Sequence, residues 1–267
     1  MTGAFIFFVF CLKLTFPAEI SADNAGTGPQ SPIDAAIARI QNEYPFRLIC
    51  RDLPPSVRPA AVYQPADKSD TQDVLTYLLL FEEEIGKYPK SFFDKNHLQG
   101  VVFVKKLFNG EQPVEGFYAR GEHLIFLDFL RDKGNAIIQR HNIHHEFYHM
   151  LEAEVLGDPE RNDAEWSSFN DASFVYGKEN LLKRVPRDTS FFTAPFPGFT
   201  SEYAMLSAKE DRAEVYGCLL MASQNKIVQR WMRKDTVLRK KVGYIKSIVH
   251  QFCEEMDEQF WQDLFSR

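Results

Sequence analysis

The stretch "IIQRHNIHHEFYHMLEAE", residues 137–154, contains four histidines and three glutamates among apolar side chains. Within it, residues 145–149 read His-Glu-Phe-Tyr-His, which fits the H-E-x-x-H pattern typical of zinc peptidases. Because only three positions of this pattern are fixed, the rest of the chain must support the interpretation. We therefore ask whether the segment forms a helix, where its histidines point, and whether a third metal ligand follows.

Placed on a helix at 100° per residue, the segment has one apolar stripe, formed by Ile143, Phe147, Met150 and Leu151. His145 and His149 fall on the opposite side, one turn apart, where both imidazoles can reach one metal ion at about 2.1 Å. Glu146 lies between the two faces, close enough to contact a metal-bound water without being a ligand. The alternative is an amphipathic helix whose polar face carries histidines but no metal.

Two further histidines precede this pair. His141, His145 and His149 form an i, i+4, i+8 row, which extends over about 12 Å and cannot converge on one ion. We therefore expect His141 and His144 to support the ligands or to lie at the surface.

A catalytic zinc site needs a third protein ligand. The metzincin pattern requires Gly at 152 and His at 155, but the chain has Glu152 and Val155. A thermolysin-like enzyme carries its third Glu some twenty residues after the second His, and the nearest candidate, Glu165, falls short of that spacing. Glu165 stays a minor alternative.

A better candidate lies in "GFTSEYAMLSAKEDRAEVYGCLLMAS", residues 198–223, where Glu210 and Glu214 are four apart on a predicted helix. The apolar run after Ala213 indicates a buried helix, and a buried carboxylate needs a cation or hydrogen-bond donors. The alternative is that Ser207 and Glu210 form an S-x-x-E capping box. Capping would explain Glu210 but would leave Glu214 without a partner.

Taken together, these motifs resemble a family. H-E-F-x-H, followed some fifty to sixty residues later by Tyr-x6-Glu-x2-Ala-Glu, is similar to zinc peptidases of the anthrax lethal factor and Pro-Pro endopeptidase type, which are gluzincin-like. It also resembles the zinc-binding metallopeptidases of exported bacterial proteins, in which "GF-x-S-x-YA…ED-x-AE" recurs. The matching stretches are residues 145–152 and 198–217. Asp211-Arg212 departs from the aromatic pair that the family has there, which affects the expected packing more than the ligands.

The resemblance implies a role for each residue that matches the motif. His145, His149 and Glu210 would bind one Zn²⁺ ion, and Glu146 would be the general base. Tyr203 would donate a hydrogen bond to the oxyanion, and Glu214 would orient a ligand histidine.

The start of the chain differs from the rest. Residues 4–12, "AFIFFVFCL", are too short to span a bilayer but have the length of a signal-peptide core. We predict a signal peptide at 1–22, a linker at 23–31, a metallopeptidase domain at 32–267, and export without a transmembrane segment in the mature chain. The alternatives for the apolar run are a mis-assigned start of the chain and an apolar N-terminal strand. The net charge of −6 provides no basic field, so we expect no nucleic-acid partner.

Strand patterns precede helix patterns along the chain. We expect strands at 46–50, 100–107 and 123–129, and helices at 32–44, 73–88 and 135–156, with a mostly helical half from about residue 200. This order predicts an α+β, zincin-like fold with a small mixed sheet packed on the active-site helix and an N-terminal lobe ending near 157. The strand at 122–129 either pairs with an extended peptide or is a core strand.

We expect three cysteines to be core residues: Cys50, Cys218 and Cys253.

The sequence therefore predicts a zinc-dependent endopeptidase acting on protein or peptide substrates. One alternative is a hydrolase that uses the same ion on amides outside peptides. The other is a binding module without catalysis, against which the intact Glu146 argues, because only catalysis requires the base.

Overall fold

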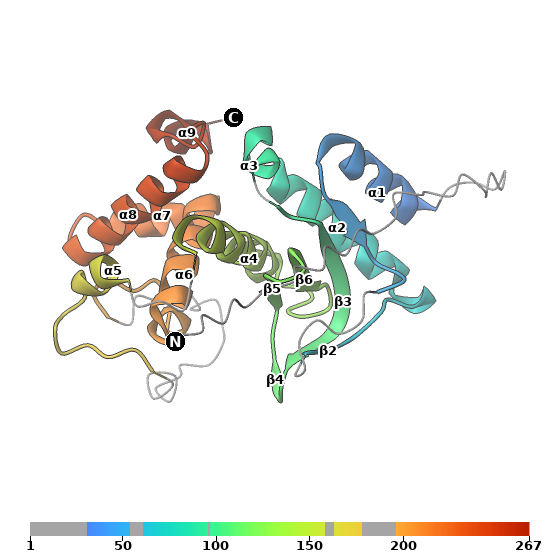
Figure 1. Cartoon of the computed structure of the whole chain (residues 1–267), viewed down its shortest axis with the longest axis horizontal. Coiled ribbons are helices and arrows are strands. Elements are labelled where there is room, and N and C mark those ends of the chain that lie inside the picture. The colour runs from blue at the N-terminus through green and yellow to red at the C-terminus, as the bar shows by residue number, and fades with distance from the viewer. Residues whose placement is uncertain (1–30, 54–60, 96, 158–162, 178–195, 267) are drawn as a thin grey trace, which may run out of the picture. The chain divides into compact units, whose positions relative to one another are not determined.

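A computed structural model describes residues 31–53, 61–95, 97–157, 163–177 and 196–266 (Figure 1). The predicted signal peptide and nearly all of the linker lie outside these residues, so both stay predictions. The described chain begins with α1 (Pro32–Glu43), as predicted. Ser31 is its N-cap and accepts a hydrogen bond from the Asp34 N–H at 3.2 Å, while Pro32 occupies the first turn.

The described strands form one mixed sheet: β1 (Arg47–Ile49), β2 (Ala61–Gln64), β3 (Gly100–Asn109), β4 (Gln112–Pro113), β5 (Gly116–Ala119) and β6 (Leu124–Asp128). Its order is β1-β3-β6-β5, with β1, β3 and β6 parallel and β5 antiparallel at the edge. β2 and β4 pair antiparallel with the other end of β3. The predicted α+β class with a small mixed sheet is confirmed.

β6 lies inside the sheet, paired with β3 on one side and β5 on the other. Its five residues are all buried, as expected for a strand covered on both faces. The strand predicted at 122–129 is therefore a core strand. The interpretation that it pairs with an extended peptide is wrong, because both of its edges already hydrogen-bond to neighbouring strands.

Helices α2 (Thr71–Ile85) and α4 (Ala136–Leu156) cover one face of the sheet. Phe81 of α2 has its ring 5.3 Å from that of Phe103 on β3 and 6.2 Å from that of Phe147 on α4. Alternate residues of β3 and β6, such as Val102 and Phe126, form a second apolar cluster on the opposite face. The sheet thus provides a rigid base for α4.

On its other side, α4 packs against the C-terminal part of the chain (Figure 1). The remaining described helices are α3 (Lys90–Asp94), α5 (Ala164–Ser168), α6 (Ala208–Leu220), α7 (Ala222–Trp231), α8 (Thr236–Phe252) and α9 (Glu258–Asp263), together with two short 3-10 helices, η1 (Lys68–Asp70) and η3 (Tyr203–Met205). Residues described from 196 onward contain helices and loops but no strand, which agrees with the predicted helical half. α4 therefore lies between the sheet and α6.

The predicted amphipathic character of α4 needs correction. Every residue from Ile143 to Ala153 is buried, because α6 covers the side that the sequence presents as polar. His141 and His144, for which a surface position was one of two expectations, are both fully buried. The polar face of this helix is thus a polar interface inside the protein.

His144 belongs to a buried charge cluster between α2 and α4. Its Nε2 lies 2.6 Å from Glu84 Oε2, and its Nδ1 lies 2.7 Å from the Tyr88 hydroxyl. Glu84 also accepts hydrogen bonds from Lys87 and Arg140. Burial opposes ionisation of Glu84, but the hydrogen bond and charge of His144 and the charge of Lys87 outweigh it and lower the pKa of Glu84 to about 2. His144 therefore fixes α2 to α4.

The three cysteines of the described chain, Cys50, Cys218 and Cys253, are buried and form no disulfide, which confirms that they are core residues. None of the helices among the described residues has both the length and the apolar character needed to cross a membrane.

Candidate metal centre

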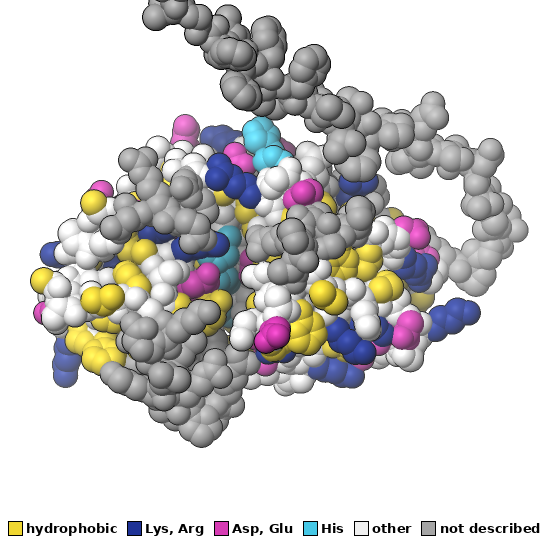
Figure 2. Space-filling model, turned by 60° about the horizontal axis from the view of Figure 1, so that its bottom comes forward, with side chains coloured by type: hydrophobic (Ala, Val, Ile, Leu, Met, Phe, Trp, Pro, Cys, Tyr) yellow, Lys and Arg dark blue, Asp and Glu magenta, His cyan; other side chains and the backbone are white. Residues whose placement is uncertain are grey.

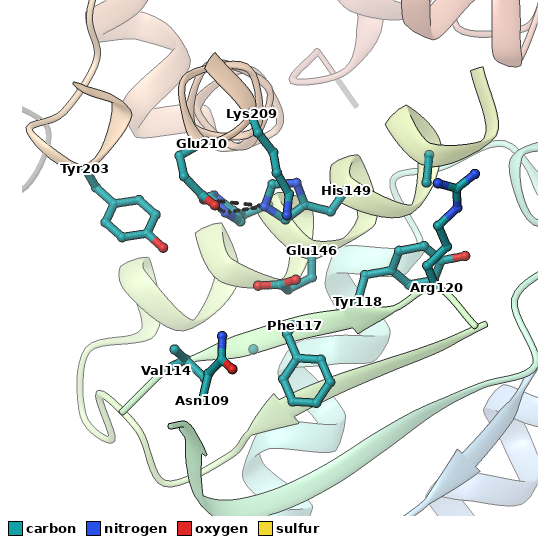
Figure 3. Close-up of a pocket in the computed structure, with 13 residues that line it drawn as sticks. Asn109, Val114, Phe117, Tyr118, Arg120, Glu146, His149, Tyr203, Lys209 and Glu210 are labelled. Atoms are coloured by element: carbon teal, nitrogen blue, oxygen red, sulfur yellow. Dashed lines mark hydrogen bonds and ion pairs between the residues drawn. The ribbon is translucent and has the colours of Figure 1, made fainter. Parts of the chain in front are cut away.

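α4 brings His145 and His149 together one turn apart, and α6 places Glu210 opposite them (Figure 3). The Nε2 atoms of the two histidines are 3.0 Å apart. Glu210 Oε2 lies 3.0 Å from His145 Nε2 and 3.4 Å from His149 Nε2. Two imidazole nitrogens and one carboxylate oxygen, contributed by two helices, therefore face a common point.

These three atoms fit a zinc ion. Ligand atoms bound tetrahedrally at 2.0–2.1 Å are about 3.3 Å from one another, and two nitrogens with a carboxylate oxygen form a donor set of catalytic zinc sites. The observed separations of 3.0–3.4 Å agree with this geometry. The three candidate ligands thus form a coherent site that leaves a coordination position for a substrate or water.

The local sequence explains how Glu210 reaches the histidines. Ser207 is the N-cap of α6 and accepts a hydrogen bond from the Glu210 N–H at 3.2 Å. Within the described residues, the Glu210 carboxylate makes no return hydrogen bond to Ser207. Only half of the predicted capping box forms, and the side chain of Glu210 points to the histidines instead. Burial opposes its ionisation, but the charge of His149 and hydrogen bonds with both histidines hold the pKa of Glu210 well below its usual range.

Glu214, one turn further along α6, holds the far side of His145. Its Oε1 lies 3.0 Å from His145 Nδ1 and 2.9 Å from His141 Nε2, and its Oε2 accepts a hydrogen bond from the Ser201 hydroxyl at 2.6 Å. His141 continues this buried chain to Gln224 at 2.9 Å. A carboxylate on the second nitrogen fixes the tautomer and orientation of a ligand histidine. His141, His145 and Glu214 are also close enough to hold a cation, but hydrogen bonds account for their arrangement.

Glu146 lies below the candidate metal ligands and against strand β5 (Figure 3). A Cβ added at Gly116 would approach Glu146 Cγ to 2.8 Å, so this glycine gives the carboxylate the space it occupies. Burial raises the pKa of Glu146, and the charges of His149 and His145 only partly offset this. Within the described chain, Glu146 Oε2 is buried without a hydrogen-bond partner. A carboxylate in this state is suited to accept a proton.

Tyr203 approaches from the opposite wall, on η3, with its ring 5.9 Å from that of His145. The charge of Glu210, together with burial, raises the pKa of Tyr203 well above its usual value. Its hydroxyl therefore keeps its proton and can donate a hydrogen bond.

Glu165, the minor alternative for the third ligand, is exposed on α5 and is part of neither potential metal cluster of the described residues.

The candidate ligands open onto a cavity of about 350 Å³. Its walls are β5 on one side and α6 with η3 on the other, and α4 lies between them (Figure 3). Histidine side chains are visible in a hollow of the molecular surface (Figure 2). Sequence reasoning missed the contributions of Gly116, Tyr118 and Arg120 to this cavity, although the aromatic pair Phe117-Tyr118 is a weak signal for a strand.

The family described as "Putative zinc-binding metallo-peptidase" matches residues 123–255, which include His145, His149 and Glu210. This part of the chain thus matches a family of zinc-binding metallopeptidases. No match was found among curated proteins. The predicted resemblance to zinc-binding metallopeptidases is confirmed, whereas the finer likeness to anthrax lethal factor and Pro-Pro endopeptidase stays a prediction.

A solved structure described as a putative zinc-binding metallo-peptidase from Bacteroides caccae has a similar fold, with a TM-score of 0.51 and 14% sequence identity. The similarity covers 88% of this chain and 94% of that one. At this identity the likeness concerns the fold alone, and it extends to the strands that precede the segment matched by the family.

Proposed function

We propose that this zinc-binding metallopeptidase is an endopeptidase in which His145, His149 and Glu210 hold one zinc ion and Glu146 is the general base. The observation that carries the proposal is the convergence of the three ligand atoms above a buried carboxylate in one cavity. When bound, zinc supplies a Lewis acid that polarises a carbonyl and lowers the pKa of a water molecule to about 7.

The remaining steps fall to side chains of this chain. Glu146 accepts a proton from the attacking water and passes it to the leaving amine, for which its raised pKa is favourable because proton transfer is most effective near the operating pH. Tyr203 donates a hydrogen bond to the oxygen that becomes negatively charged. Glu214 holds His145 in the orientation that directs Nε2 to the site.

Edge strand β5 supports a peptide substrate. Among the strands of the described residues it pairs with β6, at the edge of the sheet, and its residues line the cavity beside Glu146. An extended peptide can add to such an edge through main-chain hydrogen bonds, with little demand on its sequence. Backbone pairing does not require a free terminus near the cavity, and this favours an endopeptidase over an enzyme that removes terminal residues.

The experiment that tests this function combines zinc analysis with digestion of a proteome-derived peptide library. Wild-type protein should contain one zinc per chain and cleave internal peptide bonds. Glu146→Gln should keep zinc while cleavage falls by at least about 10²-fold, because the proton acceptor is lost. The matched control is Glu154→Gln on the same helix, outside the cavity lining, which should cleave normally. Unchanged cleavage by Glu146→Gln would exclude it as the base, and zinc without cleavage would favour a different amide hydrolase or a binding module.

We also propose export of the protein, which is supported by the apolar run at residues 4–12. N-terminal sequencing of protein recovered outside the cytoplasm should find a start near residue 23. If the protein is found in the cytoplasm and its N-terminal sequence still begins at Met1, the proposal is contradicted.

A further inference from the structure

Glu152 faces the far nitrogen of the second candidate ligand, His149. Its Oε2 lies 3.7 Å from His149 Nδ1. Both atoms are buried and neither has a hydrogen-bond partner among the described residues. Two unpaired polar atoms buried beside each other are costly, unless a small movement joins them.

Glu152 is itself held by a buried cation. Its Oε1 accepts a hydrogen bond from Nε of Arg212, whose side chain is 1% exposed. The guanidinium lies 5.9 Å from the Trp166 ring centre, and its Nη1 is 3.9 Å from Asp163 Oδ2. Arg212 follows Glu210 by two residues on α6, so the helix that contributes the third ligand also fixes the carboxylate behind His149.

The two histidines thus have equivalent surroundings. Glu214 contacts Nδ1 of His145 and is supported by His141, whereas Glu152 faces Nδ1 of His149 and is supported by Arg212. A carboxylate in this position orients a metal-binding imidazole and increases its basicity. Position 212 is not fixed in the "ED-x-AE" motif of the resembling family, so the motif does not assign this role to Arg212.

We propose that Glu152, held by Arg212, is a positioning residue for His149: when Nε2 of His149 binds the metal ion, its Nδ1–H donates to Glu152 Oε2. The proposal rests on the metal site of the proposed function. It predicts that zinc binding closes the 3.7 Å gap to a hydrogen bond of about 2.7–2.9 Å.

The test is the zinc dissociation constant of the full chain, measured by competition with a chromogenic chelator. Glu152→Gln should weaken zinc binding by about 10–100-fold, as typical for carboxylates behind a ligand histidine. Arg212→Lys retains the charge but loses the Nε–H donor, and should weaken binding in the same direction. Glu154→Gln, two residues along the same helix, is the matched control and should bind zinc like the wild type.

The outcomes separate this inference from the proposed function. If the wild type binds no zinc, the proposed function fails. If the wild type binds zinc and Glu152→Gln binds it equally well, the positioning role of Glu152 is overturned. Should the variant not fold, ¹⁵N spectra of zinc-loaded wild type decide. A slowly exchanging Nδ1–H of His149 supports the hydrogen bond, and a rapidly exchanging one overturns it.

A different observation bears on the substrate. Besides the candidate ligands and Glu146, the charged side chains of the described cavity lining are Arg120, which follows β5, and Lys209, on the first turn of α6 (Figure 3). Arg120 is exposed and forms no ion pair with a described carboxylate. Glu146 and Glu210 are occupied at the candidate metal centre, so Arg120 is the cation of this lining that can meet a substrate side chain directly.

The direction of β5 determines which part of a peptide meets Arg120. Gly116 at the start of β5 touches Glu146, and Arg120 lies four residues further on, about 13 Å along an extended strand. In an antiparallel pairing, the residues before the scissile bond lie beside the end of β5. We infer that the cavity selects peptides with an acidic side chain two to four residues before the scissile bond, recognised by Arg120 with Lys209 nearby.

This second inference also rests on the proposed function, and the peptide library tests it. Wild-type cleavage sites should be enriched in Asp and Glu at these positions, and Arg120→Glu should replace this preference with one for Lys and Arg. Arg230→Glu, at an exposed site on α7, is the control and should leave the preference unchanged. Cleavage without any acidic preference would overturn the inference, whereas the absence of all cleavage by wild type would contradict the proposed function instead.

Discussion

Gly116 is the position where the smallest change should affect catalysis most selectively. A methyl group there would lie 2.8 Å from Glu146 Cγ and 2.8 Å from the carbonyl oxygen of Phe126. Ordinary carbon contacts begin at about 3.5 Å, so Glu146 has to move by roughly 1 Å. Because the Phe126 oxygen belongs to the sheet backbone, β5 itself has to shift slightly away from β6 as well. A misplacement of this size costs about 10²-fold in rate, or about 2.7 kcal/mol of transition-state stabilisation.

We therefore expect Gly116→Ala to keep its zinc and to lose about 99% of its turnover. Gly116 does not contact the three candidate ligands, so zinc affinity should change little. The assay is kcat/KM on one peptide selected from the library, measured beside zinc content and thermal unfolding. Gly121→Ala is the matched control, because a Cβ at that turn position meets no atom within 4 Å.

Two results would refute this reasoning. If the Gly116→Ala variant binds its full zinc and turns over within about threefold of wild type, the position of Glu146 does not limit the rate. Loss of zinc together with turnover would mean that β5 supports the ligands and not the base alone.

The other predictions concern the ligands and one buried charge. His145→Ala or His149→Ala should each remove stoichiometric zinc, measured by elemental analysis; full occupancy in both would exclude the site. Glu210→Gln should weaken zinc binding more severely than Glu214→Gln, for which about 10–100-fold is expected; the reverse order of their dissociation constants would exchange the two roles. The folded-state pKa of Glu84 is about 2 against an ordinary value of 4.5, so its contribution to stability is present above pH 4.5 and lost as pH falls toward 2. This loss amounts to at most about 3 kcal/mol. Urea unfolding at pH 5, 4 and 3 should show a shallower pH dependence for Glu84→Gln than for the wild type.

Local signals made part of the site predictable. The spacing of His145 and His149 follows from helix geometry, and the length of α4 from its N-cap and the glycine after it. The placement of Glu210 opposite them needed the resemblance, because no local rule connects two helices far apart in the sequence. β5 was missed because a four-residue strand is defined by its pairing with β6 more than by its own composition.

The burial of α4 could not be read from α4 itself. Its polar face looks solvent-exposed in one sequence, because the groups that satisfy it come from other segments. Glu214 and Arg212 of α6 and Glu84 of α2 provide those groups for three of its side chains. Polar residues on a helix therefore indicate a surface only when no other helix carries complementary charges.

The charged pair Asp211-Arg212, which stands where the resemblance implies an aromatic pair, has a physical explanation of the same kind. Arg212 pairs with Glu152, and Asp211 Oδ2 lies 2.6 Å from Lys241 Nζ on α8, both fully buried. Lys241 also donates to the Gly198 carbonyl oxygen at 2.9 Å, in the segment that leads to Tyr203. Removing one partner of a buried pair costs about 3–5 kcal/mol, whereas an apolar pair of similar size is often neutral. Such charges are therefore retained or replaced together with their partners. Here Arg212 connects α6 to α4, which carries His149, and Lys241 connects Asp211 of α6 to the segment that leads to Tyr203.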